Sequence, residues 1–351
     1  MSALKRGAAE RGAGERGETV RVTNPGRVLY PQLGLTKLEL VRFYAEIGPW
    51  ILPHVQGRPL TLVRCAKGVS APDALRSQCQ FMRHTPSWHA WVPELVPRVR
   101  IAEQEKLGEY LVIDSLPALL AIINGYIVEL HTWNSTVDDL ERPDRLVFDL
   151  DPAPDVGWRQ VVAAALRLRA RLRSVGLQSW VKTTGGKGLH VVVPVVPERG
   201  WDECFAFSRA FAEALARQAP DTFTVAFERA RRTGKVLLDY KRNHRTSIAV
   251  AAFSTRARPN APVSVPIAWR ELRTLSRSDA FTVENLRARL RTLRVDPWAG
   301  YFRSRQRLLP GPPARGHRHR AAAKRRCDAT IAPPRSAGAM PLVEPRSKRR
   351  F

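Results

Sequence analysis

Between residues 58 and 267 the sequence is a succession of short apolar runs rich in β-branched residues, most of them closed by Gly, Pro or a charged residue. Stretches with helical spacing separate some of these runs, at 157–175 and 201–218, and another follows at 284–293. Short strands that alternate irregularly with helices are typical of an α+β fold with a central, mostly antiparallel sheet flanked by helices. The pattern predicts one globular domain over residues 18–310.

Individual elements follow from local signals. Thr36 and Glu39 fit a capping box that opens a helix through residues 38–51. Another helix is expected near 117–124. Strands are expected in eight segments: 58–65, 98–115 (two strands around a turn), 126–133, 145–152, 180–195 (two strands around a loop), 236–242, 246–254 and 262–269.

The chain is strongly basic, with a formal net charge of +26 over 351 residues. Such a charge favours a polyanionic partner, with nucleic acid ahead of a membrane, although a codon bias toward Arg would also raise it. Residues 1–17 and 311–351 are predicted to be disordered, the latter as a basic tail with eleven Lys and Arg against two acidic residues. Neither a secretory signal nor an apolar run of about 18 residues is found.

Four widely scattered cysteines, without a CxxC pair, predict a reducing cytoplasm and no disulfide framework. Cys79, His84 and His89 have metal-ligand chemistry, but the residues around them are typical of a basic loop. We therefore do not expect a metal there.

Two carboxylates, Asp149 and Asp151, lie near the end of the strand expected over residues 145–152. Residues i and i+2 of a strand point to one face, so both carboxylates project together while Phe148 and Leu150 face the core. Like charges repel unless a cation lies between them, and carboxylate oxygens suit Mg²⁺ or Mn²⁺. By itself the pattern fits either a polymerase-type metal site or a solvated strand end.

A third acid, Asp239, ends the apolar run 236–238 and precedes several basic residues. In that place it would complete a two-metal site with Asp149 and Asp151. The alternative is a structural ion pair with Arg242.

A Gly-rich segment, residues 182–191, connects two expected strands. Its three glycines allow close approach of the backbone and present N–H groups to phosphate oxygens, and Lys187 and His190 add side-chain donors. The segment is neither the dinucleotide fingerprint nor a Walker loop. It fits either a phosphate site or a hairpin turn.

Arg256 and Arg258 alternate in the segment 253–259, which we expect to be a strand or a strand end. On a strand the two guanidiniums would share one face, where they would clamp a triphosphate or a template backbone. The alternative is a solvated basic edge.

In this order the motifs resemble the archaeo-eukaryotic primase superfamily. Closer still is the polymerase domain of bacterial ligase D, the end-joining repair enzyme, which the sequence resembles over roughly residues 20–305. The matching strings are NPGRVLYPQLGLTKLELVRFYAEI, LPHVQGRPLTLVRC, YIVELHTWNS, RLVFDLDPAP, VKTTGGKGLHVVVPV, VLLDYKRN and FSTRARPNAPVSVPIAW.

The resemblance implies that Asp149, Asp151 and Asp239 are catalytic ligands of two Mn²⁺ or Mg²⁺ ions, with NTP or dNTP as substrates. It also implies residues that line the nucleotide: His131, Thr184, Lys187, His190, Arg242, Arg256 and Arg258. The implied DNA contacts are Arg27 and Lys37 for the 5′-phosphate of a broken end, Arg64 nearby, and Phe81 as the ring on which a template base stacks. Thr184 replaces the Ser of many relatives, and Arg27 replaces a more usual Lys.

The function implied is nucleotide addition at primer 3′ ends, at DNA breaks and gaps with 5′-phosphorylated ends, in bacterial non-homologous end joining. Ku and an ATP-dependent DNA ligase are the implied partners of a monomeric enzyme that works at the nucleoid, without a membrane. No ligase or phosphoesterase segment follows residue 310, so a stand-alone polymerase is expected. The alternatives are a primase that starts strands de novo and a non-catalytic DNA-end-binding protein.

Overall fold

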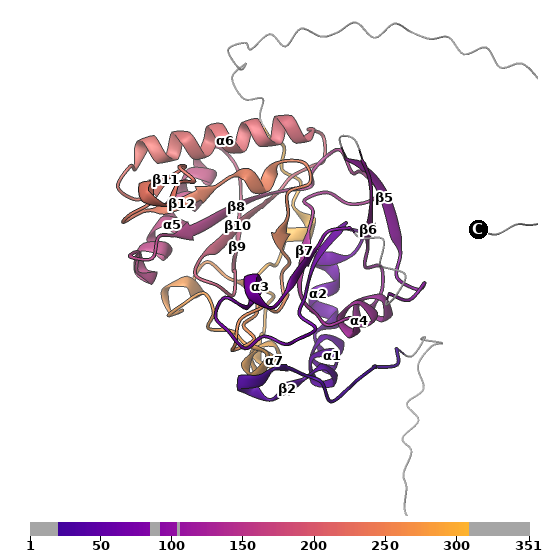
Figure 1. Cartoon of the computed structure of the whole chain (residues 1–351). Helices are drawn as coiled ribbons and strands as arrows, with labels where there is room; N and C mark the ends of the chain where they lie inside the picture. Colours follow the sequence, from indigo (N-terminus) through magenta and orange to yellow (C-terminus); the bar gives the residue numbers. More distant parts are fainter. Residues whose placement is uncertain (1–19, 85–91, 104–105, 309–351) are drawn as a thin grey trace, which may run out of the picture. The chain divides into compact units, whose positions relative to one another are not determined.

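The computed structural model describes residues 20–84, 92–103 and 106–308 (Figure 1). The disorder predicted for residues 1–17 and 311–351 lies outside these ranges, as does His89. Among the described residues, no helix is long and apolar enough to cross a membrane.

Most strands of the C-terminal half form a six-stranded sheet. Its order is β11 (Phe223–Thr224), β12 (Val236–Asp239), β8 (Arg145–Pro152), β10 (Leu189–Pro194), β9 (Trp180–Thr183) and β14 (Pro266–Ile267). Neighbours are antiparallel except β11 and β12. β8 and β10 are the long central strands: every residue of β10 is buried, and β8 buries Leu146, Val147, Phe148 and Leu150 and carries Asp149 and Asp151 at its less buried end.

A second sheet has four antiparallel strands, in the order β13 (Ala249–Val250), β7 (Ile127–Thr132), β3 (Leu60–Arg64) and β4 (Gln80–Met82). Two hairpins complete the β structure: β1 (Val28–Tyr30) with β2 (Leu35–Thr36), and β5 (Arg98–Glu103) with β6 (Lys106–Leu111). The predicted mixed, mostly antiparallel fold is confirmed, with the strands divided between two main sheets.

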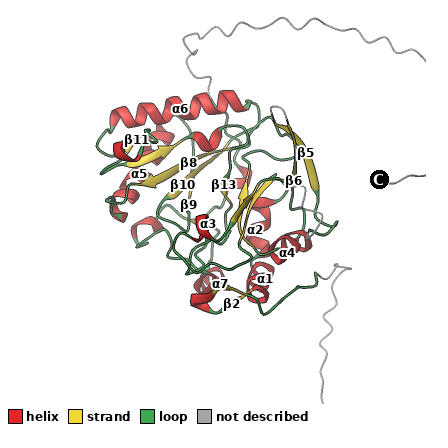
Figure 2. Cartoon of the chain, in the orientation of Figure 1, coloured by secondary structure: helices red, strands yellow, loops and turns green. Residues whose placement is uncertain are grey.

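Helices cover the outer faces of both sheets (Figure 2). α5 (Trp158–Ser174) and α6 (Trp201–Gln218) pack on the six-stranded sheet, where the rings of Phe148 and Phe211 lie 5.4 Å apart. α1 (Lys37–Glu46), α2 (Gly48–Val55) and α4 (Leu116–Asn124) lie on the side of the four-stranded sheet. Two more helices are α3 (Ala74–Ser77) and α7 (Val283–Thr292). The inner faces of the two sheets therefore meet, and Val147, Val192 and Ala249 pack together there.

The predicted capping box is confirmed at the start of α1. The Thr36 hydroxyl accepts from the Glu39 N–H at 3.3 Å, and Glu39 accepts from the Thr36 N–H at 2.7 Å. The single helix expected over residues 38–51 is instead two helices that meet at Ile47. Pro49 lacks an N–H, and its ring excludes the helical position of the carbonyl four residues before it, so α1 cannot continue.

Three expected strands are shorter or absent. Segment 246–254 forms only β13, and segment 262–269 forms only β14. Segment 253–259 is a loop with one isolated bridge, Thr255 to Val263, so Arg256 and Arg258 do not lie on a strand. The positive φ of Phe253 (65°) turns the chain out of an extended path.

The absence of disulfides predicted from the scattered cysteines is wrong for one pair. Cys65 and Cys79 form a disulfide, with Cα atoms 4.4 Å apart. The pairing of β3 with β4 places Arg64 opposite Gln80, so the next residues, Cys65 and Cys79, face each other across the strands. Spacing along the chain did not show this because the contact depends on strand register.

Candidate active site

Four titratable side chains form a row across the six-stranded sheet. Asp239 on β12 is in register with Asp149 on β8, Asp149 with His190 on β10, and His190 with Lys182 on β9. Side chains directly opposite each other in antiparallel strands share a face, so the row projects from one side of the sheet. That side faces the four-stranded sheet, away from α5 and α6. This register brings Asp149 and Asp239 side by side.

Asp151 lies two residues beyond Asp149 on the same face, and basic side chains neutralise all three acids. The Arg242 guanidinium bridges Asp149 and Asp239 through Nη2 and Nε, both at 3.2 Å. Arg232 reaches Asp151 Oδ2 at 3.1 Å. The alternative suggested by the sequence, an ion pair between Asp239 and Arg242, is therefore present, and Arg242 also holds Asp149.

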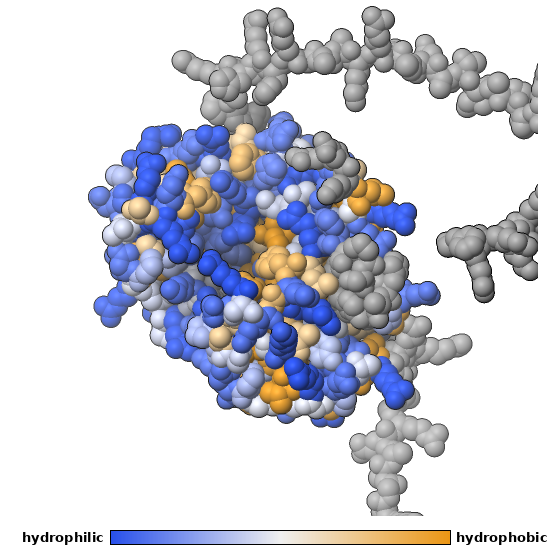
Figure 3. Space-filling view, in the orientation of Figure 1, coloured by the Kyte–Doolittle hydropathy of each residue, from blue (hydrophilic) through white to orange (hydrophobic). Residues whose placement is uncertain are grey.

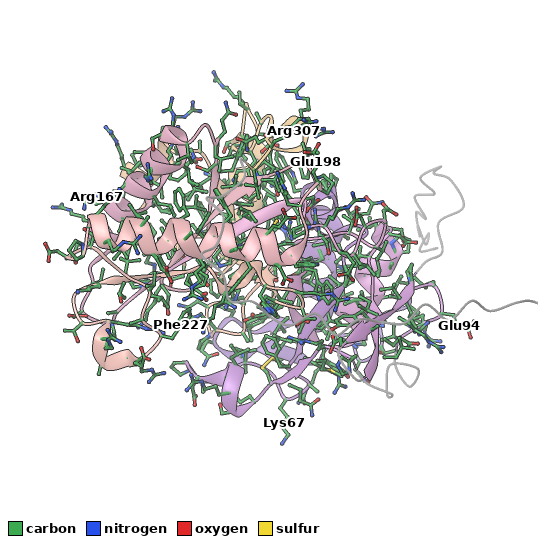
Figure 4. All side chains as sticks on the ribbon, turned by 90° about the horizontal axis from the view of Figure 1, so that it is seen from above. Lys67, Glu94, Arg167, Glu198, Phe227 and Arg307 are labelled. Atoms are coloured by element: carbon green, nitrogen blue, oxygen red, sulfur yellow. A yellow bond between two sulfur atoms is a disulfide. The ribbon has the colours of Figure 1, made fainter. Side chains whose placement is uncertain are left out.

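Local structure fixes both arginines. Arg242 lies in a short 3₁₀ turn, Lys241–Asn243, directly after β12, and the Asn243 side chain exchanges two hydrogen bonds with the Val147 backbone of β8. Arg232 donates to the Ala226 and Phe227 carbonyls. Phe227, labelled in Figure 4, packs under Lys241, whose Nζ is 3.7 Å from the ring centroid.

The three acids differ in their electrostatic environment. Burial would raise the pKa of Asp149, but His190, Arg242 and Lys182 outweigh it and hold that pKa well below its usual range. Burial, helped by the charge of Asp149, raises the pKa of both Asp151 and Asp239. A divalent cation would relieve this repulsion between carboxylates.

The donors on this face fit Mg²⁺ or Mn²⁺, because all three are carboxylates and both ions prefer oxygen ligands. Within the described ranges, no three His, Cys, Asp or Glu side chains are grouped closely enough to form a metal site. The positive charge among the carboxylates comes instead from Arg242 and Arg232.

His190 and Lys182 complete the row. Burial and the nearby Lys182 lower the pKa of His190 to about 4, so its imidazole is neutral at pH 7. His190 Nε2 lies 3.5 Å from Asp149 Oδ1. Lys182 is buried and donates to Ser264 Oγ at 2.6 Å, and burial lowers its pKa well below the usual value. Lys182 was not among the predicted site residues. Its position just before the Gly-rich segment is the signal that could have found it.

The Gly-rich loop 184–188 packs tightly against β8. A Cβ on Gly188 would lie 2.0 Å from the Leu150 carbonyl oxygen, so only glycine fits there. The Thr184 hydroxyl is used inside the loop, where it donates to the Gly188 carbonyl and accepts from the Gly186 N–H. Lys187 is exposed. The loop is therefore held as a rigid turn whose Lys187 side chain faces solvent.

Arg256 links this loop to the second sheet. Its Nη1 donates to the Thr184 carbonyl, and its Nε lies 3.1 Å from Oε1 of Glu129 on β7. Glu129 Oε2 lies 2.8 Å from His131 Nε2. Burial would raise the pKa of Glu129, but Arg256, His131 and the Ala257 N–H outweigh it and lower that pKa to about 2. Sequence reasoning missed Glu129, although an acid inside the apolar run 126–133 was a signal.

Arg258 lies beside the same loop. Its Nη2 atom would be 3.5 Å from a Cβ atom placed on Gly186. Burial and the charge of Arg256 lower its pKa. Although the two arginines do not share a strand, both lie against the Gly-rich loop. The structure therefore brings Thr184, Arg256 and Arg258 together and places His131 on the facing sheet.

The four predicted DNA contacts lie on the side of the four-stranded sheet. Phe81 on β4 is 54% exposed, and its ring centroid is 5.3 Å from that of His131. Arg27 is exposed and donates to the Ala66 carbonyl, whereas Lys37 is buried and donates to Thr23 Oγ1 and the Asn124 carbonyl. Arg64 donates to the Gly125 carbonyl. Figure 3 shows hydrophobic atoms between the positions of β10 and β7, with hydrophilic atoms around them.

Of Cys79, His84 and His89, only the first two lie among the described residues, and their side chains have other partners. Cys79 is bonded to Cys65, and His84 lies 3.7 Å from Glu103.

Comparison with known proteins gives consistent similarities. Residues 36–298 match the family model "LigD, primase-polymerase domain". The chain is 37% identical over 290 residues to "Multifunctional non-homologous end joining protein LigD" of Pseudomonas aeruginosa, covering 82% of this chain and 34% of that protein. It is 25% identical over 288 residues to "Bifunctional non-homologous end joining protein LigD" of Bacillus subtilis, covering 82% of this chain and 45% of that protein.

A solved structure, "Polymerase Domain from Mycobacterium tuberculosis Ligase D in complex with DNA", aligns with a TM-score of 0.70 at 27% identity, covering 78% of this chain and 95% of that chain. The chain spans less than half the length of the two curated relatives above.

Proposed function

Because the chain belongs to the LigD primase-polymerase domain family, we propose that it is a template-handling polymerase that adds nucleotides to primer 3′ ends. Its place of action would be breaks and gaps with 5′-phosphorylated ends during bacterial non-homologous end joining, with Ku and an ATP-dependent ligase as partners at the nucleoid. The observation that carries the proposal is the row of Asp239, Asp149 and His190, with Asp151 beside it.

In the reaction, the primer 3′-hydroxyl attacks the α-phosphorus of a nucleoside triphosphate, ribo or deoxyribo, and pyrophosphate leaves. Asp149, Asp151 and Asp239 would hold two Mg²⁺ or Mn²⁺ ions, which supply activation of the hydroxyl and neutralisation of phosphate charge. Arg242 and Arg232 provide positive charge at these carboxylates, so they would compete with the ions for carboxylate oxygens.

The remaining residues would bind and orient the triphosphate. Lys187 is exposed on the Gly-rich loop, and Arg258 lies beside the same loop, which supports a role for both in binding phosphate oxygens. Neutral His190 can donate a hydrogen bond without adding charge. Thr184 acts through the loop, because its hydroxyl is engaged by Gly186 and Gly188.

Primer extension tests the proposal. A gapped duplex with a labelled primer, NTP or dNTP, and Mg²⁺ or Mn²⁺ is incubated with the wild type and with Asp149→Ala, Asp151→Ala and Asp239→Ala. Each substitution is expected to abolish extension, whereas Asp221→Ala, which changes an exposed acid outside the row, should retain it. Wild-type extension by a folded variant would remove that aspartate from the metal role.

The same assay separates the alternatives. A primase would synthesise strands on a template without a primer, and a non-catalytic end-binding protein would bind the gap without extending it. End recognition is tested by Arg27→Gln, which should lose the preference for a 5′-phosphorylated gap. Lys67→Gln removes one charge from an exposed side chain nearby, labelled in Figure 4, and should keep the preference. Equal binding of both gaps by the wild type would favour the primase.

A further inference from the structure

A basic groove runs beside α5, away from the carboxylates. A cavity of about 640 Å³ lies between α5, the start of β9 and residues 268–273. A second cavity, of about 580 Å³, lies between the first turns of α5 and residues 272–276. Both are lined by Arg273, and we call them together the α5 groove. None of Asp149, Asp151 or Asp239 lines either cavity.

The charge of the α5 groove is unbalanced. Arg169, Arg173, Arg270 and Arg273 line the first cavity, and Arg159 lines the second. Within the described part of the chain, none of these five arginines forms an ion pair with a carboxylate. Glu271 lies between Arg270 and Arg273 in the sequence, but its carboxylate is paired with Arg289 at 2.7 Å. Burial and the charge of Arg173 lower the pKa of Arg169. Such a cluster of like charges is relieved when an anion binds.

Flat aromatic rings line the same groove in fixed positions. Trp269 and Trp180 line the first cavity, and Trp158 lines the second. The indole N–H of Trp269 donates to the Ser179 carbonyl at 2.7 Å, and that of Trp158 donates to the Leu275 carbonyl at 2.6 Å. The guanidinium of Arg169 lies 4.8 Å from the Trp269 ring centroid. Indoles held in this way lose little entropy when a planar ligand stacks on them.

One polar group in the wall has no partner. Ser179 lines the first cavity, and its Oγ is buried without a hydrogen bond to any described residue. Buried hydroxyls are nearly always paired, but this Oγ has less than 1 Å² of accessible surface, so a ligand oxygen in the cavity would reach it only after the Ser179 side chain turned.

We propose that the α5 groove binds a strand of single-stranded nucleic acid, with phosphates on its arginines and bases stacked on its indoles. Interleaved guanidiniums and aromatic rings are the usual surface for single strands. Five arginines in two adjoining cavities exceed what one free nucleotide needs, which favours a strand. α5 begins at Trp158, six residues after the last residue of β8, so the groove starts near the sheet end that carries Asp151. This inference goes beyond the proposed function, since binding here needs no nucleotide addition.

Neutralising two groove arginines tests the proposal. The full-length protein with Arg270→Gln and Arg273→Gln is compared with Arg167→Gln and Arg217→Gln, which removes the same charge from exposed positions on α5 and α6. Arg167, labelled in Figure 4, does not line the groove. Anisotropy of a labelled oligo(dT) is followed against salt. Each phosphate contact contributes about 0.7 to the slope of log affinity against log salt for a single strand. If both substituted arginines contact phosphates, the gain in affinity on going from 1 M to 0.1 M salt should be about 25-fold smaller for the groove variant than for the wild type. The control variant should show the same gain as the wild type.

Photo-crosslinking keeps the test valid if the double variant fails to fold. Wild-type protein irradiated with an oligonucleotide that carries 5-iodouracil should crosslink at Trp158 or Trp269. Equal salt slopes for the two double variants, or crosslinks confined to other peptides, would overturn the proposal. Poly-glutamate that competes as well as oligo(dT) would also overturn it in favour of an acidic protein partner. None of these results bears on the aspartate variants, so the polymerase proposal is judged separately.

Discussion

Glu129 offers the sharpest test of how the site is held together. It is 1% exposed, and its carboxylate contacts His131, Arg256 and the Ala257 N–H at 2.7–3.1 Å. Glu129→Gln keeps the shape of the side chain and one accepting oxygen but removes the charge. Arg256, whose side chain is 15% exposed, then becomes a largely buried cation without its counter-ion, which is costly.

The lowered pKa of Glu129 gives the size of the stability that its charge contributes to the folded protein. The pKa falls from an ordinary 4.5 to about 2 in the folded protein, which corresponds to roughly 3 kcal/mol at 1.36 kcal/mol per pKa unit. Because the folded pKa is lowered, this stability is present above pH 4.5 and is lost as the pH falls toward 2. The difference in stability between wild type and Glu129→Gln should shrink from about 3 kcal/mol at pH 7 to roughly half of that at pH 3.

Urea denaturation at several pH values measures this difference. Glu141→Gln serves as the control because Glu141 forms a more exposed ion pair with Arg245, and its loss should cost less than about 1 kcal/mol. Nucleotide affinity of Glu129→Gln should also fall, since Arg256 and His131 lose their common anchor. A penalty that is independent of pH between 7 and 3 would show that packing, not charge, makes Glu129 important.

Three further predictions follow from single contacts. Gly188→Ala should lower the free energy of unfolding by about 3 kcal/mol, because the Leu150 carbonyl cannot move away; Gly186→Ala, with no contact under 3.3 Å, should cost much less in the same denaturation experiment. Lys182→Met should change the free energy of unfolding by less than about 1 kcal/mol, because a costly buried charge is removed. Single-nucleotide addition should nevertheless slow at least tenfold, and an unchanged rate would show that Lys182 has no role in nucleotide addition. Thr36→Ala should cost about 1 kcal/mol by thermal or chemical melting, as the loss of an N-cap does.

Elements with strong local signals were predictable from sequence. α6 has the predicted bounds, Trp201–Gln218, because its apolar positions repeat with helical spacing and Gly200 precedes it. The Asp149 and Asp151 pair was predictable because the period of a strand fixes which face each residue takes.

Features that depend on strand register were not predictable. The Cys65–Cys79 disulfide and the place of Lys182 in the row both follow from which residues lie opposite each other on neighbouring strands. A local pattern does not carry that information. The same holds for segment 253–259, where local alternation predicted a strand but the positive φ of Phe253 and the side-chain contacts of Arg256 produced a loop.

The candidate site is built from both sheets, and this explains why Glu129 matters for function as well as stability. The carboxylates, His190 and Lys182 come from the six-stranded sheet, whereas Glu129 and His131 come from β7 of the other sheet. Arg256 joins them, because it donates to the Thr184 carbonyl of the Gly-rich loop and pairs with Glu129. Any change that loosens the packing between the sheets therefore also moves the phosphate-binding side chains relative to the carboxylates. We accordingly expect stability and nucleotide affinity to fall together in Glu129→Gln, and a variant that lost one without the other would show that the two sheets contribute to the site independently.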